Sequence, residues 1–171
     1  QIMGRFFDEA LLPYVDDFCK RSENERAHFL FLHLAGSHFP WNEAYPSSWS
    51  FFPSDLRDGV TAGLDARKCA CVNHYDNSIR YTDAVLSQVI AKIRALRRPA
   101  FVVYVSDHGE TPSAGSMRKE SDPDLWEIPL VIWLSPEYRK AFPDVCARLS
   151  DRSALPLQSD QLFYGFLDLA R

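Results

Sequence analysis

The chain has no long apolar run and no excess of basic residues. Its 171 residues carry 19 Lys and Arg against 23 Asp and Glu, which gives a formal net charge of -4. No stretch approaches the roughly 18–20 consecutive apolar residues of a membrane-spanning helix, and no basic patch is present for nucleic acid. The chain starts at Gln1 and shows no charged-then-apolar leader. We therefore expect a piece of a longer polypeptide, with any signal or membrane anchor outside it.

Cysteine is scarce, and its spacing excludes the common small zinc modules. The four cysteines form no CxxC pair, so they do not resemble the ligands of a zinc ribbon. An even number is compatible with an oxidising compartment, but connectivity cannot be read from spacing. Disulfides and buried thiols both remain open for Cys19, Cys69, Cys71 and Cys146.

The residues that are present predict one globular domain over residues 1–171. Hydrophobic residues make up 46% of the chain and aromatic residues 13%, enough to bury one sizeable core. The elements that periodicity predicts are a helix over 4–21 interrupted at Pro13, a buried strand over 28–34, an irregular excursion over 39–72, a helix over 73–98 capped by Asn73, strands over 101–105 and 128–134, and a terminal helix over 160–169 capped by Ser159.

A strand, a helix and a strand follow one another between residues 28 and 105. This order predicts a right-handed parallel crossover, which brings the loops after both strands to one edge of the sheet. His38 follows the first strand, and Asp107 and His108 follow the second. We therefore expect an α/β fold with three α/β/α layers, a mainly parallel sheet and a functional site at that edge.

The segment from Phe101 to Glu110 runs an apolar strand directly into an Asp-His pair. Ionised carboxylate and neutral imidazole are oxygen and nitrogen ligands that Zn²⁺ accepts. Gly109 lets the backbone turn beside an ion without a Cβ clash. The alternative is a structural loop held by a buried hydrogen bond between Asp107 and His108.

The aromatic residues of the excursion also have two interpretations. Trp41, Tyr45 and Trp49 could contact a lipid or a membrane surface, or they could pack beneath the loop. We favour packing, because it is the ordinary role of aromatic side chains under a long loop.

Four blocks of sequence occur in order along the chain. They are residues 36–40 (GSHFP), 73–83 (NHYDNSIRYTD), 106–110 (SDHGE) and 128–135 (IPLVIWLS). Together they resemble the phosphoethanolamine transferases, a family of the alkaline phosphatase and sulfatase superfamily whose patterns are similar to GSHxP, NxYDNxxxYxD, SDHGE and a strand ending in WLS. The resemblance spans most of residues 28–135. It implies an alkaline phosphatase-like fold, of which this chain is the later part.

The resemblance also implies an activity for the parent protein. In that family a membrane-embedded region anchors a catalytic domain at the periplasmic face of the bacterial inner membrane. A zinc-bound threonine takes phosphoethanolamine from phosphatidylethanolamine and passes it to lipid A or to lipopolysaccharide core sugars. Zinc suits this chemistry because it lowers the pKa of the hydroxyl and neutralises charge on the phosphoryl oxygens.

Site residues follow from the resemblance position by position. Asp107 and His108 match zinc ligands, and His38 matches a residue that contacts phosphate or a second metal. Glu110 could orient a ligand from behind the metal site, or it could be a solvent-facing loop charge or a residue at a helix start. The NxYDN block is assigned first to helix capping and to bracing the sheet edge.

The chain departs from the family pattern at two places. Residues 1–27 contain acids but no counterpart of the nucleophilic threonine, so we expect no catalytic residue here and no activity from the chain alone. Two protein ligands rarely hold an ion that takes four, so we expect weak zinc binding or none. The family also carries a His-Gly soon after SDHGE, whereas no histidine lies between Glu110 and Ile128.

Two alternatives remain for the function of the parent protein. A sulfatase-like or phosphodiester hydrolase would share the Asp-His ligands and use water as acceptor, although the NxYDN block argues against it. A domain that binds lipid headgroups or a partner protein without turnover is the second alternative. The missing histidine after Glu110 is its best support.

Overall fold

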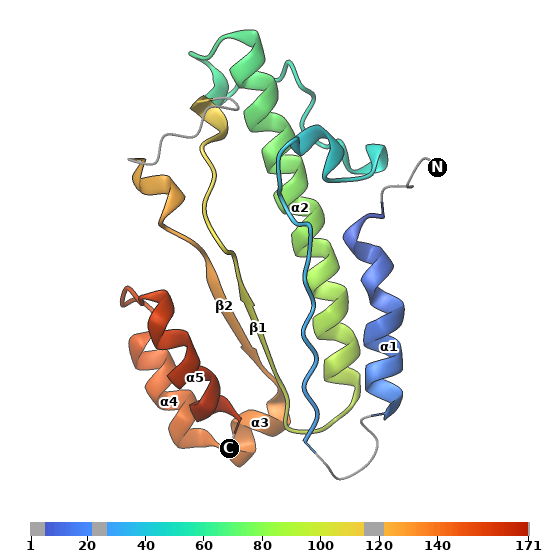
Figure 1. Ribbon diagram of the computed structural model, residues 1–171, viewed down its shortest axis with the longest axis vertical. Coiled ribbons are helices and arrows are strands. Elements are labelled where there is room, and N and C mark those ends of the chain that lie inside the picture. The colour runs from blue at the N-terminus through green and yellow to red at the C-terminus, as the bar shows by residue number, and fades with distance from the viewer. Residues whose placement is uncertain (1–5, 22–26, 115–121, 171) are drawn as a thin grey trace.

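The computed structural model describes residues 6–21, 27–114 and 122–170. The long helix α2 (Ala66–Ala95) runs along most of the molecule, between α1 (Leu12–Arg21) and the strands β1 (Phe101–Val105) and β2 (Leu130–Leu134) (Figure 1). Helices α3 (Pro136–Ala141), α4 (Pro143–Arg152) and α5 (Leu162–Leu169) lie beside the strands, toward the end where α2 finishes. The short 3-10 helices are η1 (Asp8–Leu11), η2 (Trp41–Glu43), η3 (Ser47–Trp49), η4 (Gly59–Thr61), η5 (Pro112–Ala114), η6 (Pro123–Leu125) and η7 (Ser159–Gln161).

The two strands form one antiparallel pair. Phe101 lies opposite Leu134 and Val105 lies opposite Leu130, which confirms strands at both predicted places. Within the described ranges the sheet has only these strands, so the parallel pairing that we expected there is not formed. The molecule is nevertheless a mixture of helix and sheet, as the sequence predicted.

The predicted buried strand over 28–34 is wrong in two respects. The segment is extended but pairs with no strand in the part of the chain that the structure describes. Its side chains alternate, with Leu30, Leu32 and Leu34 half-buried toward α2, while Phe29 and Phe31 are 77% and 75% exposed. A continuous apolar run suggested burial on both faces, but only the face toward the helix is covered.

The predicted start of the long helix is also wrong. Helix α2 begins at Ala66, and the carboxylate of Asp65 caps it by accepting a hydrogen bond from the Lys68 amide at 2.9 Å. Asn73 is therefore not a cap but a buried residue two turns inside the helix. Few apolar residues recur at helical spacing before Asn73, so the sequence pattern did not indicate the first two turns of α2.

The helices at the two ends of the chain match the sequence better. The interruption predicted at Pro13 is confirmed, because η1 gives way to α1 there, with Pro13 in the first turn of α1. Residues 4 and 5 of that prediction lie outside the described residues. The terminal helix is confirmed as α5, but it begins at Leu162 after η7, and no side chain caps it.

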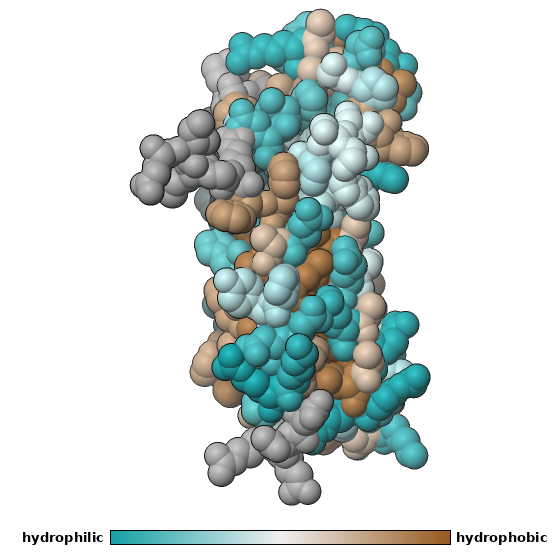
Figure 2. Space-filling view, turned by 90° about the vertical axis from the view of Figure 1, so that its right-hand side faces the viewer, coloured by the Kyte–Doolittle hydropathy of each residue, from teal (hydrophilic) through white to brown (hydrophobic). Residues whose placement is uncertain are grey.

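The core consists of clusters arranged along α2 and beside the strands. Val15 of α1 packs with Val89 and Ile93 of α2, while Tyr81 and Val85 pack beneath the excursion with Tyr45. A further cluster joins Leu134, Tyr138, Val145 and Leu169 at the other side of the sheet. The face that carries α1 is mainly polar, with apolar residues showing between the polar ones (Figure 2). None of the described helices is both long and apolar enough to cross a bilayer.

Truncation of Val15 tests the contact between α1 and α2. Val15 is fully buried, so Val15→Ala is expected to lower the free energy of unfolding by about 2 kcal/mol through lost burial and a residual cavity. Urea denaturation measures this change. Tyr14→Ala is the control, because Tyr14 is 66% exposed and should change stability little. Equal losses for both variants would contradict this account of the core.

Candidate metal and phosphate site

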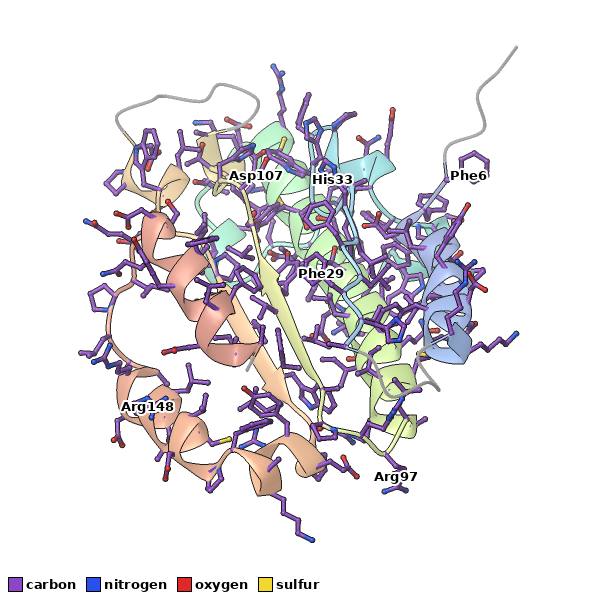
Figure 3. All side chains as sticks on the ribbon, turned by 60° about the horizontal axis from the view of Figure 1, so that its bottom comes forward. Phe6, Phe29, His33, Arg97, Asp107 and Arg148 are labelled. Carbon is purple, nitrogen blue, oxygen red and sulfur yellow. The ribbon has the colours of Figure 1, made fainter. Side chains whose placement is uncertain are left out.

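The residues predicted for the site line one groove. The extended segment 27–35 and β1 run in the same direction, so the loops that follow them lie toward the same end of the molecule (Figure 1). A groove of about 1510 Å³ is lined by residues of both loops, including His38, Asp107, His108 and Glu110. Figure 3 shows Asp107 and His33 toward that end of the molecule. Phe29, which comes earlier in segment 27–35, lies farther from it. The two loops that carry the predicted residues therefore line the same groove.

The local backbone orients Asp107 and His108. The Asp107 Oδ1 atom accepts a hydrogen bond from the His108 amide at 3.0 Å. The His108 Nδ1 atom lies 2.8 Å from the Gly109 carbonyl oxygen, so Nδ1 carries the hydrogen and donates it. In the neutral ring this arrangement leaves the lone pair on Nε2, which is the form of imidazole that binds a metal.

The separation between the two side chains distinguishes the two interpretations of the Asp-His pair. His108 Nε2 and Asp107 Oδ2 are 3.8 Å apart, which is too long for a hydrogen bond. The Asp107 side chain is also 87% exposed, so no buried hydrogen bond between the side chains of Asp107 and His108 holds this loop. Both atoms lie close enough together to bind one ion, since Zn–N and Zn–O bonds are each about 2.0–2.2 Å.

His38 is held in the same way as His108. Its Nδ1 atom is hydrogen-bonded to the carbonyl oxygen of the next residue, Phe39, which leaves the lone pair on Nε2. Gly36 precedes it with φ +56°, a left-handed conformation that favours glycine. The exposed imidazole of His38 is thus available as an acceptor or ligand at the groove.

Gly109 is required by close packing. Its amide donates to the Leu125 carbonyl oxygen at 2.9 Å, which ties the site loop to η6. A Cβ atom at position 109 would lie 1.8 Å from the Asp124 carbonyl oxygen. The sequence predicted that position 109 needs glycine because a Cβ atom would clash with a bound ion. In the structure, the group that a Cβ atom would clash with is the backbone of η6.

A matched pair of glycine substitutions tests this close approach. Gly109→Ala is expected to lower the free energy of unfolding by about 1–3 kcal/mol, because η6 must move away from the site loop. Gly165→Ala, in helix α5 with open space around its Cβ position, should instead stabilise by about 0.5–1 kcal/mol. Thermal and urea denaturation compare the two variants. A neutral Gly109→Ala would show that η6 does not constrain the loop.

Asp8 holds the other loop of the site, a role that the sequence did not reveal. Its Oδ1 and Oδ2 atoms accept hydrogen bonds from the amides of Ala35 and Gly36, each at 2.8 Å. The Asp8 side chain is buried, and two successive backbone amides compensate its charge. Asp8 therefore fixes the turn that presents His38. An acid at the start of a short helix gives no signal of such a partner 27 residues away.

Asp8→Asn tests the contribution of this carboxylate. The side-chain amide keeps one acceptor and presents an N–H group to the second backbone amide, so about 2 kcal/mol of unfolding free energy should be lost. Amide hydrogen exchange at Ala35 and Gly36 should become faster. Asp17→Asn is the control, because Asp17 is exposed and its partner Arg21 is exposed as well. Unchanged exchange at residues 35 and 36 would contradict the positioning role.

The NxYDN block holds the irregular excursion against α2. The Asn77 Oδ1 atom accepts from the amides of Phe51 and Phe52, and its Nδ2 atom donates to the Phe52 carbonyl oxygen and to the Tyr45 hydroxyl. Asn73 donates to the Leu56 carbonyl oxygen at 2.9 Å. These buried amides satisfy loop backbone groups, so capping and bracing of the sheet edge are not their roles here.

The aromatic residues of the excursion pack as we favoured. Trp41 and Tyr45 are 3% and 5% exposed, and the Trp41 ring meets Tyr75 edge-on at 5.8 Å. Burial raises the pKa of Tyr75, with a smaller contribution from the nearby Glu110 carboxylate. The Tyr75 hydroxyl therefore remains protonated beside Glu110 at neutral pH. This electrostatic interaction indicates that Tyr75 of α2 lies near the site loop.

The donors present fit part of a zinc site. Carboxylate oxygen and imidazole nitrogen are suitable in kind, but no group of three or more His, Cys, Asp or Glu side chains with metal-binding geometry occurs within residues 6–21, 27–114 and 122–170. All four cysteines are free thiols, and the buried Cys69 donates to the Leu56 carbonyl oxygen at 3.1 Å. The disulfide that the sequence left open is therefore absent.

Comparison with known proteins assigns the chain to a family. The model of the sulfatase family matches residues 3–171, so the chain belongs to that family. It is 34% identical over 116 residues to Kdo(2)-lipid A phosphoethanolamine 7''-transferase of Escherichia coli, covering 65% of this chain and 20% of that protein. It is 26% identical over 171 residues to phosphoethanolamine transferase EptA of Helicobacter pylori, covering 94% and 30%.

A solved structure has the same fold. The C-terminal periplasmic domain of EcEptC from Escherichia coli, crystallised as a complex with Zn, superposes with a TM-score of 0.71 at 26% identity. The match covers 84% of this chain and 41% of that one. The predicted family and the alkaline phosphatase-like α/β class are confirmed. The chain spans only about a fifth to a third of the length of the curated relatives it matches.

Proposed function

We propose that this chain is the later part of the catalytic domain of a zinc-dependent phosphoethanolamine transferase. The enzyme would move phosphoethanolamine from phosphatidylethanolamine to lipid A or to a lipopolysaccharide core sugar. The transfer would pass through a phosphorylated threonine outside residues 1–171, with the parent protein anchored at the periplasmic face of the bacterial inner membrane. The fragment alone would be inactive, because it contains neither the nucleophile nor a full set of metal ligands.

One observation carries the proposal. The Nε2 atom of His108 and the Oδ2 atom of Asp107 lie 3.8 Å apart at the carboxyl end of β1, each oriented by a hydrogen bond from or to the backbone. Relatives named as phosphoethanolamine transferases and a neighbour solved with Zn support the choice of reaction and metal. A pair oriented before any ion binds is suited to a metal centre.

The roles of the residues follow from their positions. Asp107 and His108 would hold zinc, and bound zinc would supply a lowered pKa for the nucleophilic hydroxyl and a counter-charge for phosphoryl oxygens. His38 would contact a phosphoryl oxygen from the facing loop, held there by Asp8. Glu110 would accept a hydrogen bond or orient a ligand beside Tyr75.

Zinc content of the full-length protein tests the proposal. Asp107→Ala and His108→Ala are each expected to lower zinc affinity at least about a hundredfold, measured by elemental analysis and calorimetry. His28→Ala and Asp151→Ala are matched controls, because both side chains are exposed and lie outside the site loops. Full zinc occupancy in the Asp107 and His108 variants would refute the assignment of these ligands.

The same protein allows the reaction to be tested. Incubation with phosphatidylethanolamine should transfer one phosphoethanolamine group to a threonine hydroxyl and release diacylglycerol, and mass spectrometry of the intact protein should detect the added group. Addition of lipid A should then discharge it to the lipid. Phosphoethanolamine released to water alone would identify a hydrolase.

A domain without turnover is the second candidate, and the absence of histidine between Glu110 and Ile128 favours it. Stoichiometric zinc binding with no phosphorylated threonine would identify that case.

A further inference from the structure

A set of linked hydrogen bonds fastens the irregular excursion to α2. The Asn77 Oδ1 atom accepts hydrogen bonds from the amides of Phe51 and Phe52 at 2.9 and 2.8 Å. Because Oδ1 faces these two donors, the Nδ2 atom of Asn77 donates to the Phe52 carbonyl oxygen and to the Tyr45 hydroxyl. Asn77 is fully buried and Tyr45 is 5% exposed, so water cannot readily replace these bonds.

The Tyr45 hydroxyl extends these bonds to His74. Its oxygen lies 2.8 Å from the His74 Nδ1 atom. The hydroxyl already accepts from Asn77 and has one hydrogen to donate, and it has no other acceptor among the described residues. Nδ1 therefore accepts, and the hydrogen of the neutral ring is on Nε2. This is the opposite tautomer from that of His38 and His108.

Protonation of His74 would disrupt this arrangement. The ring is half-buried, so a proton from solvent can reach it. Nδ1 is the only ring atom that can take a further proton, and it would then donate to the Tyr45 oxygen rather than accept from it. The hydroxyl would meet two donors, and its own hydrogen would be buried without an acceptor. An unmade hydrogen bond of a buried group shifts a local equilibrium about fivefold or more.

Burial favours the neutral form of His74. It lowers the pKa of this imidazole from its ordinary value of 6.5, and no charged group among the described residues contributes to the shift. The titratable side chains of α2 within one turn of His74, and of the excursion elements packed on α2, are Cys71, Tyr75, Asp76, Glu43, Tyr45 and Asp58. The site loop adds Glu110 near Tyr75, whereas η5, which also packs on α2, has no titratable side chain.

The excursion forms part of the wall of the groove. Four of its residues line the groove beside His38, namely Phe39, Pro40, Glu43 and Ala44. The backbone hydrogen bonds of the excursion close short turns and 3-10 helices, so this segment should open more readily than the long helix beneath it. A change in the contact at Tyr45, the next residue along the chain, would therefore act on the wall next to the candidate site.

We propose that His74 and Tyr45 form an acid-sensitive latch, in which protonation of His74 releases the excursion from α2 and loosens the groove wall next to His38. The latch depends on the hydrogen bonds between these side chains and not on the proposed reaction. Its effect on transfer would rest on the proposed function. Histidine suits such a switch because its charge changes within the range of pH that proteins ordinarily meet.

Proton linkage gives the direction of the switch. A released His74 takes up a proton near pH 6.5, whereas the buried, hydrogen-bonded ring resists protonation. The released form therefore binds more protons and gains population as the pH falls below that value. The latch should be closed above pH 6.5 and should open progressively below it.

Hydrogen–deuterium exchange of the full-length protein tests the latch. Protection of the Phe51 and Phe52 amides, corrected for the pH dependence of intrinsic exchange, should fall about tenfold between about pH 8 and about pH 5. The Ala100 amide is the reference, because it donates to the neutral hydroxyl of buried Ser135 and should keep its protection. Constant protection at Phe51 and Phe52, or an equal fall at Ala100, would overturn the inference.

Three variants assign the effect to the two side chains. In His74→Asn the side-chain carbonyl can accept from Tyr45 but cannot be protonated, so protection should no longer depend on pH. In Tyr45→Phe protection should be low at both pH values. His28→Asn is the matched control and should respond to acid like the natural sequence, because His28 is exposed and lies outside the excursion. A full acid response in His74→Asn would overturn the inference and point to Asp76, whose pKa is raised by burial and by Asp58.

Zinc content of the same samples separates the latch from the proposed function. An acid response at Phe51 and Phe52 in a protein that binds no zinc would support the latch and refute the proposed metal site. Full zinc binding without an acid response would overturn the latch alone.

Discussion

The packing of side chains against helix α2 is the interaction on which the rest of the structure depends. Helix α1 docks on it through Val15, the excursion through Asn73 and Asn77, and segment 27–35 through its leucines. Among the described residues β1 and β2 pair only with each other, so α2 is the common reference for both site loops. Burial along this one helix therefore sets where His38 and Asp107 lie.

The site loops are shaped by the need to satisfy backbone groups. The Asp8 carboxylate binds two successive amides before His38, and the Gly109 amide binds η6 after His108. Each histidine donates from Nδ1 to the carbonyl oxygen of the next residue, which leaves Nε2 with its lone pair. These candidate ligands are thus oriented by the polypeptide itself, and a metal ion would not have to supply that order.

The motifs indicated the right positions more reliably than the right roles. The four blocks identified the family, and the Asp-His pair stands at the end of β1 as predicted. Asn73 was expected to cap a helix, but Asp65 does so and Asn73 binds the excursion. A short motif shows which residue types are present. The hydrogen-bond partners of these residues lie in other segments, which only folding brings near.

The sequence by itself determined the α/β class, the two strands around the Asp-His pair, the long helix before them and the family. Hydrophobic periodicity and local motifs carry that information, because neighbouring residues decide secondary structure and turn chemistry. Only the tertiary structure decided that Asp8 holds the turn before His38, that Gly109 packs against η6, and that segment 27–35 lacks a strand partner within the described residues. These features depend on contacts between residues far apart in the chain, which no local pattern encodes.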